Sequence, residues 1–173
     1  MNELEKGALK GVKVLDFSTL LPGPLASLFL AETGAEVIKI ERPVTGDEMR
    51  LSHPKWNDES VSFSMLNRGK KSLCLDLKDQ SSKDILKPLI ETADIIIEQF
   101  RPGVMKRLGL DYESIKKINS KIIYVSITGY GQTGPKKMVA GHDLNYIGNS
   151  GLLSLSMGTK EKPTVPPALI ADI

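Results

Sequence analysis

The chain has 173 residues, which is enough for one domain with a sizeable hydrophobic core. An apolar fraction of 40%, a charged fraction of 25% and a net charge of +2 describe an ordinary soluble protein and favour neither a nucleic-acid partner nor a membrane partner. The single cysteine excludes an internal disulfide and fits a reducing compartment, so the cytoplasm is the expected location.

The first forty residues predict a βαβ unit. Residues 11–17 (GVKVLDF) and 36–41 (EVIKIE) are short apolar runs typical of buried strands, and residues 25–33 between them have apolar side chains at helical spacing. Residues 18–24 (STLLPGP) form a turn whose prolines suit a helix start, and Gly34 suits the helix end. Such a unit implies a parallel sheet.

Three further strands follow, joined by helices. We expect the strands at residues 72–77, 94–100 and 121–128, and the helical segments at 81–92, 104–108, 112–118 and about 142–152. Residues 42–68 show little periodicity, which predicts a long loop with one short helix near residues 62–66. The alternation predicts an α/β fold with a doubly wound, mainly parallel sheet. Because an apolar run ends one residue past Asp172, we expect residues 1–173 to be part of a larger domain.

Residues 129–134 (GYGQTG) match the glycine pattern of dinucleotide-binding loops. That fingerprint requires the turn after the first strand, directly before a helix and with an acidic residue about twenty positions on. Here the pattern follows the fifth predicted strand and runs into Pro135. NAD and flavin are therefore not expected, and two histidines with one cysteine give no metal-ligand spacing.

Basic residues lie near the predicted carboxyl ends of several strands. They are Arg42, Arg68, Lys70, Lys71, Lys78, Arg101 and Arg107. A single Lys or Arg is usually a solvated surface residue. Several at the edge where open α/β sheets bind their ligands favour a polyanionic small molecule.

One histidine and one aspartate are candidates for proton-transfer chemistry. His142 lies in a Gly-His-Asp-Leu-Asn-Tyr block, and Asp172 follows an apolar run thirty residues later. A side chain that titrates near neutrality and a carboxylate are suitable as a general acid and base. The alternative is structural: His142 caps a helix and Asp172 begins another one.

Several segments together resemble the family III CoA-transferases. They are residues 9–17 (LKGVKVLDF), 22–24 (PGP), 34–43 (GAEVIKIERP), 67–72 (NRGKKS), 75–78 (LDLK), 100–104 (FRPGV) and 128–135 (TGYGQTGP). The family includes formyl-CoA and carnitine CoA-transferases and the α-methylacyl-CoA racemases. Its members have a Rossmann-like fold, are considerably longer than this chain and form interlocked homodimers. The resemblance therefore implies the N-terminal half of such an enzyme.

The resemblance also implies an activity. The Gly-His-Asp-Leu-Asn-Tyr block looks like the racemase branch, in which His142 and Asp172 would move a proton on and off the α-carbon of a 2-methylacyl-CoA thioester. In a CoA-transferase, Asp172 would instead be the nucleophile that carries acyl and CoA groups. An inactive truncated remnant is the third alternative.

The resemblance assigns ligand contacts as well. The implied CoA contacts are Arg42, Leu75, Lys78, Phe100, Arg101, Arg107, Gly131 and Lys137. No cofactor is implied beyond the CoA moiety of the acyl-CoA substrate, and no metal or NAD. In a eukaryote, mitochondria and peroxisomes would be alternatives to the cytoplasm.

Overall fold

The computed structural model describes residues 7–155 and 158–173. The chain divides into two compact units, of which the first ends at Ile127 and the second begins at Thr128. The second unit contains helix α6 (Asp143–Asn149) and the 3-10 helix η3 (Leu152–Leu155). The assignment of residues 1–173 to one larger domain stays a prediction.

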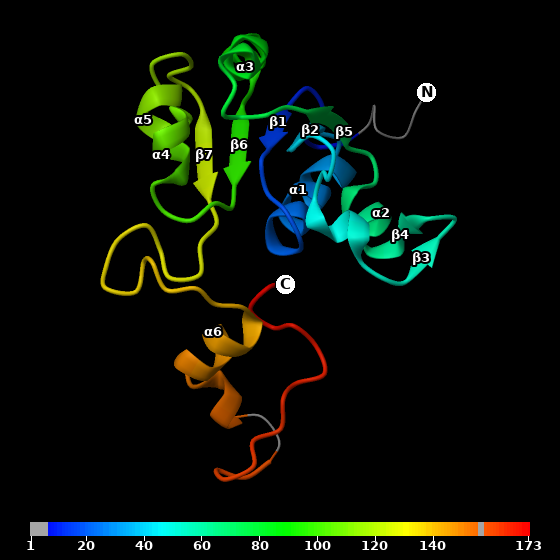
Figure 1. Ribbon diagram of the computed structural model, residues 1–173, viewed down its shortest axis with the longest axis vertical. Helices are drawn as coiled ribbons and strands as arrows, with labels where there is room; N and C mark the ends of the chain where they lie inside the picture. Colours follow the sequence, from blue (N-terminus) through cyan, green and yellow to red (C-terminus); the bar gives the residue numbers. More distant parts are fainter. Residues whose placement is uncertain (1–6, 156–157) are drawn as a thin grey trace. The chain divides into compact units, whose positions relative to one another are not determined.

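In the described part of the first unit, five parallel strands form a sheet in the order β5-β2-β1-β6-β7 (Figure 1). The strands are β1 (Lys13–Asp16), β2 (Glu36–Glu41), β5 (Lys71–Cys74), β6 (Ile95–Glu98) and β7 (Ile123–Ser126). The chain starts in the middle of the sheet, moves outward to β5, and returns to add β6 and β7 on the other side of β1. The predicted α/β fold with a doubly wound, mainly parallel sheet is confirmed.

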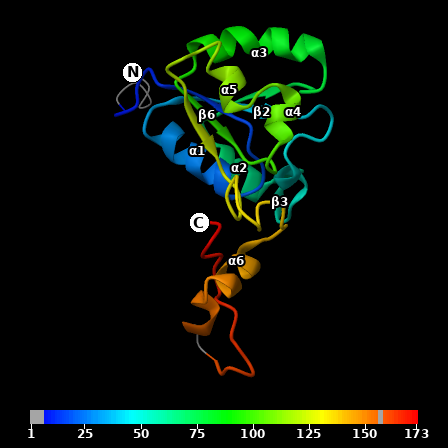
Figure 2. The same ribbon diagram turned by 90° about the vertical axis from the view of Figure 1, so that its left-hand side faces the viewer.

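Helices cover both faces of this sheet (Figure 2). One face carries α1 (Pro22–Glu32) and α2 (Val61–Asn67), and the other carries α3 (Gln80–Thr92), α4 (Val104–Leu108) and α5 (Tyr112–Ile115). This division follows from the chain path, since right-handed crossovers on the two sides of a central strand lie on opposite faces.

The central strands β1, β2 and β6 are buried on both faces, and their alternating residues supply two cores. Val14 of β1 packs with Ala31 of α1 and Ile97 of β6, whereas Leu15 packs on the opposite face with helices α3, α4 and α5. Leu86 of α3 is completely buried there. Because successive side chains of a strand point to opposite faces, one short apolar run contributes to both cores.

The segment between β2 and β5 contains more structure than the predicted loop. The short helix near residues 62–66 is confirmed as α2, but a 3-10 helix, η2 (Glu48–Leu51), precedes it. A hairpin also pairs β3 (Lys55–Trp56) with β4 (Glu59–Ser60). Its turn residues Asn57 and Asp58 have φ values of 46° and 67°, a backbone conformation that Asn and Asp tolerate.

Several other predicted elements are shorter in the structure, including the strands expected at residues 11–17, 72–77 and 94–100, which cover four residues each. The strand expected at residues 121–128 covers four residues, and the helical segment expected at 112–118 ends at Ile115. The helix expected to reach residue 152 ends at Asn149, and Gly151 separates it from η3 with a φ of 83°. A positive φ cannot continue a right-handed helix.

Candidate functional site

A cavity of about 410 Å³ lies at the carboxyl ends of β1, β2, β5 and β6. Its apolar lining is Phe17, Ile40, Leu75, Leu77, Phe100, Val104 and Leu108, and its charged lining is Lys39, Glu41, Arg42, Asp47, Glu48, Asp76 and Lys78. Because parallel strands all end at the same edge, this is the position where open α/β sheets bind ligands. All of these residues belong to the first unit.

Four of the residues expected to contact CoA line this cavity, namely Arg42, Leu75, Lys78 and Phe100. Arg101 and Arg107 are also in the first unit, but they are exposed and do not line the cavity. Gly131 and Lys137 belong to an exposed loop of the second unit. The structure thus brings four of the eight residues together, and a contact between CoA and any of the eight stays a prediction.

Arg42 is already engaged at the rim of the cavity. Its Nε donates a hydrogen bond to the Gly46 carbonyl at 3.1 Å, and one terminal nitrogen forms an ion pair with Glu48 Oε1 at 3.0 Å. Both side chains of this pair are more than half exposed. Within the described part of the chain no ion-pair partner is found for the exposed Lys78.

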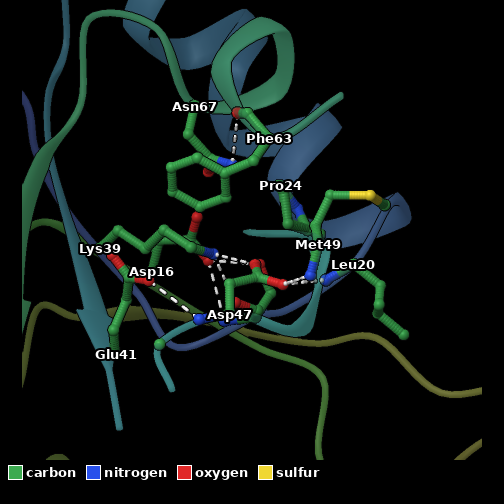
Figure 3. A network of polar contacts seen from close by, with 12 residues as sticks. Asp16, Leu20, Pro24, Lys39, Glu41, Asp47, Met49, Phe63 and Asn67 are labelled. Atoms are coloured by element: carbon green, nitrogen blue, oxygen red, sulfur yellow. Dashed lines mark hydrogen bonds and ion pairs between the residues drawn. The ribbon is translucent and has the colours of Figure 1, made fainter. Parts of the chain in front are cut away.

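The inner wall of the cavity contains a buried ion pair (Figure 3). Lys39 Nζ lies 2.8 Å from Asp47 Oδ2 and donates a hydrogen bond to the Ser18 carbonyl, also at 2.8 Å. The other Asp47 oxygen accepts the backbone N–H groups of Leu20 at 3.1 Å and Met49 at 2.9 Å. This pair therefore connects strand β2 to the loop before α1 and to the segment that carries Glu48.

A second buried carboxylate fixes the same segment. Glu41 accepts two hydrogen bonds from Arg50 at 2.8 Å, one from the Asp47 backbone at 2.9 Å and one from the Ser72 hydroxyl at 2.6 Å. Burial alone would raise the pKa of the Glu41 carboxyl, but these hydrogen bonds outweigh it and lower that pKa to about 2. The Glu41 side chain is ionised and compensated, so it contributes no free negative charge to the cavity.

A third buried group connects the sheet to α1 and α2. Lys70 Nζ lies 3.4 Å from Asp16 Oδ2 and donates to the Pro24 carbonyl at 2.8 Å, the Ser27 hydroxyl at 2.7 Å and Asn67 Oδ1 at 2.9 Å. Burial lowers the pKa of the Lys70 ammonium to about 8, although Asp16 acts in the opposite direction. We assign this cluster a structural role, because its members do not line the cavity.

In the second unit, His142 and Asp172 both lie at the start of α6. His142 precedes the helix, and its backbone N–H donates to Asn145 Oδ1 at 3.0 Å while its side chain is exposed. Asp143 is buried and accepts the Ala171 backbone N–H at 2.6 Å, which holds the 171–172 segment against the helix. Burial raises the pKa of the Asp172 carboxyl, the Asp143 carboxylate raises it further, and His142 lowers it.

The glycine-rich loop packs against the same helix. The rings of Tyr130 and Tyr146 meet edge to face with centroids 5.3 Å apart, and the Tyr146 hydroxyl donates to the Gly141 carbonyl at 2.6 Å. A Cβ at Gly129 or Gly141 would overlap the Tyr146 ring. Gly129 and Gly141 are therefore required for the packing of Tyr146, a requirement separate from the phosphate-binding role of dinucleotide loops.

Sequence reasoning overlooked several charged cavity residues, among them Lys39, Asp47 and Glu48. The signal for Lys39 was present, since a lysine in the middle of an apolar strand of a parallel sheet must find a buried partner. In residues 7–155 and 158–173 no cluster of three His, Cys, Asp or Glu side chains has the arrangement of a metal site. No helix in those residues is long and apolar enough to cross a membrane.

Comparison with known proteins gives one consistent family. The profile of "CoA-transferase family III" matches residues 9–173. The mouse "Succinyl-CoA:glutarate CoA-transferase" is 42% identical over 95% of this chain, and the human "Alpha-methylacyl-CoA racemase" is 38% identical over 95%. The chain spans 38% and 40% of the lengths of these two relatives.

A solved structure agrees with the sequence comparison. A CAIB/BAIF family protein from Brucella suis superimposes with a TM-score of 0.90 at 36% identity, covering 96% of this chain and 45% of that one. The predicted correspondence to part of the family III fold is confirmed. This chain therefore belongs to CoA-transferase family III.

Proposed function

We propose that this chain provides the CoA-binding part of an acyl-CoA enzyme, and that the enzyme is a CoA-transferase working through Asp172. The observation that carries the CoA assignment is the cavity in which Arg42, Leu75, Lys78 and Phe100 meet. The transferase assignment is supported by relatives such as the succinyl-CoA:glutarate CoA-transferase of mouse. The CoA-transferase hypothesis therefore replaces the racemase hypothesis as our first choice.

The lining of the cavity suits both the purine ring and the phosphate groups of CoA. The side chains of Leu75 and Phe100 offer an apolar surface on which a purine ring would pack. Arg42 and Lys78 at the rim offer a guanidinium fork and a point charge for phosphate oxygens. Apolar contact inside and positive charge outside are what binding of CoA requires.

In the proposed transfer, the Asp172 carboxylate attacks the thioester carbonyl carbon and CoA leaves as a thiolate. The thiolate then attacks the resulting anhydride at the Asp172 carbonyl, which releases the first acid as its carboxylate and leaves CoA on the aspartate as a thioester. The acceptor carboxylate and the aspartyl thioester repeat these two steps in reverse. A raised pKa of Asp172 favours this role, because a more basic carboxylate is the better nucleophile.

Racemisation is the second candidate, favoured by the position of His142. The Ala171–Asp143 hydrogen bond brings Asp172 to the helix start that His142 precedes. A base on one face of the α-carbon and an acid on the other would then exchange its proton through an enolate. The human α-methylacyl-CoA racemase is a relative at 38% identity, which supports this alternative.

The CoA assignment is tested by calorimetric titration of the chain with CoA. We expect Arg42→Ala to weaken binding and the weakening to shrink with added salt. Lys71→Ala is the matched control, because Lys71 is an exposed cation in an ion pair with Glu36 and does not line the cavity. Equal effects of the two variants would contradict the assignment.

The chemistry is tested separately with acyl-CoA substrates, for the chain and for a longer chain that contains it. A transferase should form an Asp172 adduct that hydroxylamine traps, and Asp172→Asn should abolish it. A racemase should instead wash deuterium from heavy water into the α-position of a 2-methylacyl-CoA and lose this exchange in His142→Ala. CoA binding with neither adduct nor exchange would identify an inactive remnant. Sedimentation would test the homodimer that the resemblance implies.

A further inference from the structure

We propose that Glu48 is a specificity-determining residue of the cavity, one that weakens the binding of anionic ligands by competing with them for Arg42. The inference rests on the proposed function in one respect, since it takes the ligand to carry phosphate groups. It adds a repulsive element to a site in which the other assigned residues are attractive. Removing the Glu48 carboxylate should therefore improve binding.

The competition follows from the contacts of Arg42. Its Nε donates a hydrogen bond to the Gly46 carbonyl at 3.1 Å, and a terminal nitrogen donates one to Glu48 at 3.0 Å. A guanidinium can bind a phosphate through the same pair of donors, because its N–H groups form a planar fork. A phosphate bound in that fork has to take the place of the Glu48 carboxylate.

The backbone of Glu48 cannot move far when this exchange occurs. Glu48 is the first residue of η2 and follows Asp47, which is 1% exposed and held by Lys39 and by three backbone hydrogen bonds. Only the side chain of Glu48 is free to rotate. A displaced carboxylate therefore stays at the rim and repels the anion that displaced it.

Two other acids of the cavity are themselves buried and are neutralised by cationic partners, and this distinguishes Glu48 from them. Asp47 pairs with Lys39 and Glu41 pairs with Arg50. The Glu48 side chain is 57% exposed and its pairing with Arg42 is correspondingly weak, so a multiply charged phosphate can break it. A ligand with little negative charge does not break the ion pair between Arg42 and Glu48. Glu48 thereby lowers the affinity for anionic ligands relative to ligands that leave this ion pair in place.

The test is calorimetric titration of the chain with CoA and, separately, with inorganic pyrophosphate at low ionic strength. Glu48→Gln should lower the Kd for both probes about two- to five-fold, the range expected for one exposed ion pair. The gain should disappear at about 1 M salt. Glu36→Gln is the matched control, since Glu36 also forms an exposed ion pair, with Lys71, and does not line the cavity.

The dependence on Arg42 is tested in the double variant Arg42→Gln/Glu48→Gln. The gain from Glu48→Gln should be smaller in this background than in the wild type, because no guanidinium remains for the carboxylate to occupy and only its repulsion of the anion is removed. Thermal melts confirm that each variant is folded. An unchanged or weaker affinity in Glu48→Gln, an equally large gain without Arg42, or an equal gain in Glu36→Gln would each overturn the inference.

The two probes separate this inference from the proposed function. Pyrophosphate binding that depends on Arg42 and improves in Glu48→Gln, without CoA binding, would refute the function and support the inference. CoA binding that Arg42→Gln weakens and Glu48→Gln leaves unchanged would do the reverse. If neither probe binds the wild type or Glu48→Gln, both are wrong, because Glu48 then has no anion to exclude.

Discussion

Replacing Lys39 by methionine should destabilise the first unit far more than replacing a surface lysine. The Lys39→Met substitution keeps an unbranched side chain of similar length, so the loss of the ammonium is the main change. Lys39 and Asp47 have side-chain exposures of 2% and 0%. Without Lys39, the Asp47 carboxylate stays buried with no counter-ion.

The magnitude follows from that burial. Breaking a buried ion pair by removing one partner costs about 3–5 kcal/mol. The Ser18 carbonyl also loses its donor from Lys39 Nζ, a contribution of about 1 kcal/mol. We therefore expect the free energy of unfolding to fall by about 4 kcal/mol or more. The exposed Lys71–Glu36 pair, at 69% and 43% exposure, should contribute less than about 1 kcal/mol.

Urea titrations followed by far-ultraviolet circular dichroism measure both values. Lys71→Met is the control, because it makes the same chemical change in a neighbouring strand of the same sheet. The double variant Lys39→Met/Asp47→Asn should be more stable than Lys39→Met alone, since it removes the orphaned charge. The reasoning is refuted if Lys39→Met costs no more than Lys71→Met, or if the second substitution restores nothing.

Three further outcomes are expected. The lowered pKa of Glu41 corresponds to about 3 kcal/mol of stabilisation, or about 2 kcal/mol after allowing for the partly exposed Arg50. This stabilisation should be present above about pH 4.5 and lost as the pH falls toward about 2. The urea midpoints of wild type and Glu41→Gln should therefore differ at pH 5 and approach each other at pH 3. Gly46→Ala should weaken CoA binding and lower the melting temperature more than Gly69→Ala. Both glycines have a positive φ, 62° and 77°, but only at Gly46 would a Cβ clash, at 2.7 Å from Glu41 Oε2. Gly129→Ala should disorder the tyrosine packing of the second unit, seen as a loss of near-ultraviolet dichroism, whereas Gly148→Ala, whose Cβ would meet open space, should leave it intact.

Hydrophobic periodicity predicted the elements that bury apolar side chains. Residues 36–41 form β2 with the predicted bounds, and 104–108 form α4 likewise. The hairpin of β3 and β4 was missed because its strands have two residues each and are mostly exposed, so no period can be read from them. Local turn chemistry at Asn57 was the only signal.

The candidate site was predictable to the extent that it depends on topology. Arg42, Lys78 and Phe100 meet because the ends of parallel strands meet. Arg107 illustrates the limit of that rule, since it follows β6 in the chain but is exposed on α4, outside the cavity. The pairing of Lys39 with Asp47 depends on how a long side chain crosses to another loop, which no residue pattern encodes.

The position of β1 in the middle of the sheet has a consequence for how the chain folds. On one side β1 pairs with β2, which follows it after a single short helix. On the other side β1 pairs with β6, where the Lys13 backbone N–H donates a 2.9 Å hydrogen bond to Asp94 Oδ2, 81 residues further along the chain. Bringing together segments so distant in sequence costs chain entropy before any contact offsets it. The seam between β1 and β6 should therefore form late and set the refolding rate. The strands on either side of it, β2 with β5 and β6 with β7, are joined by shorter connections and can pair earlier. Assembly would then proceed from the two edges of the sheet inward, and the buried valine at the seam, Val14, should report on the rate-limiting step.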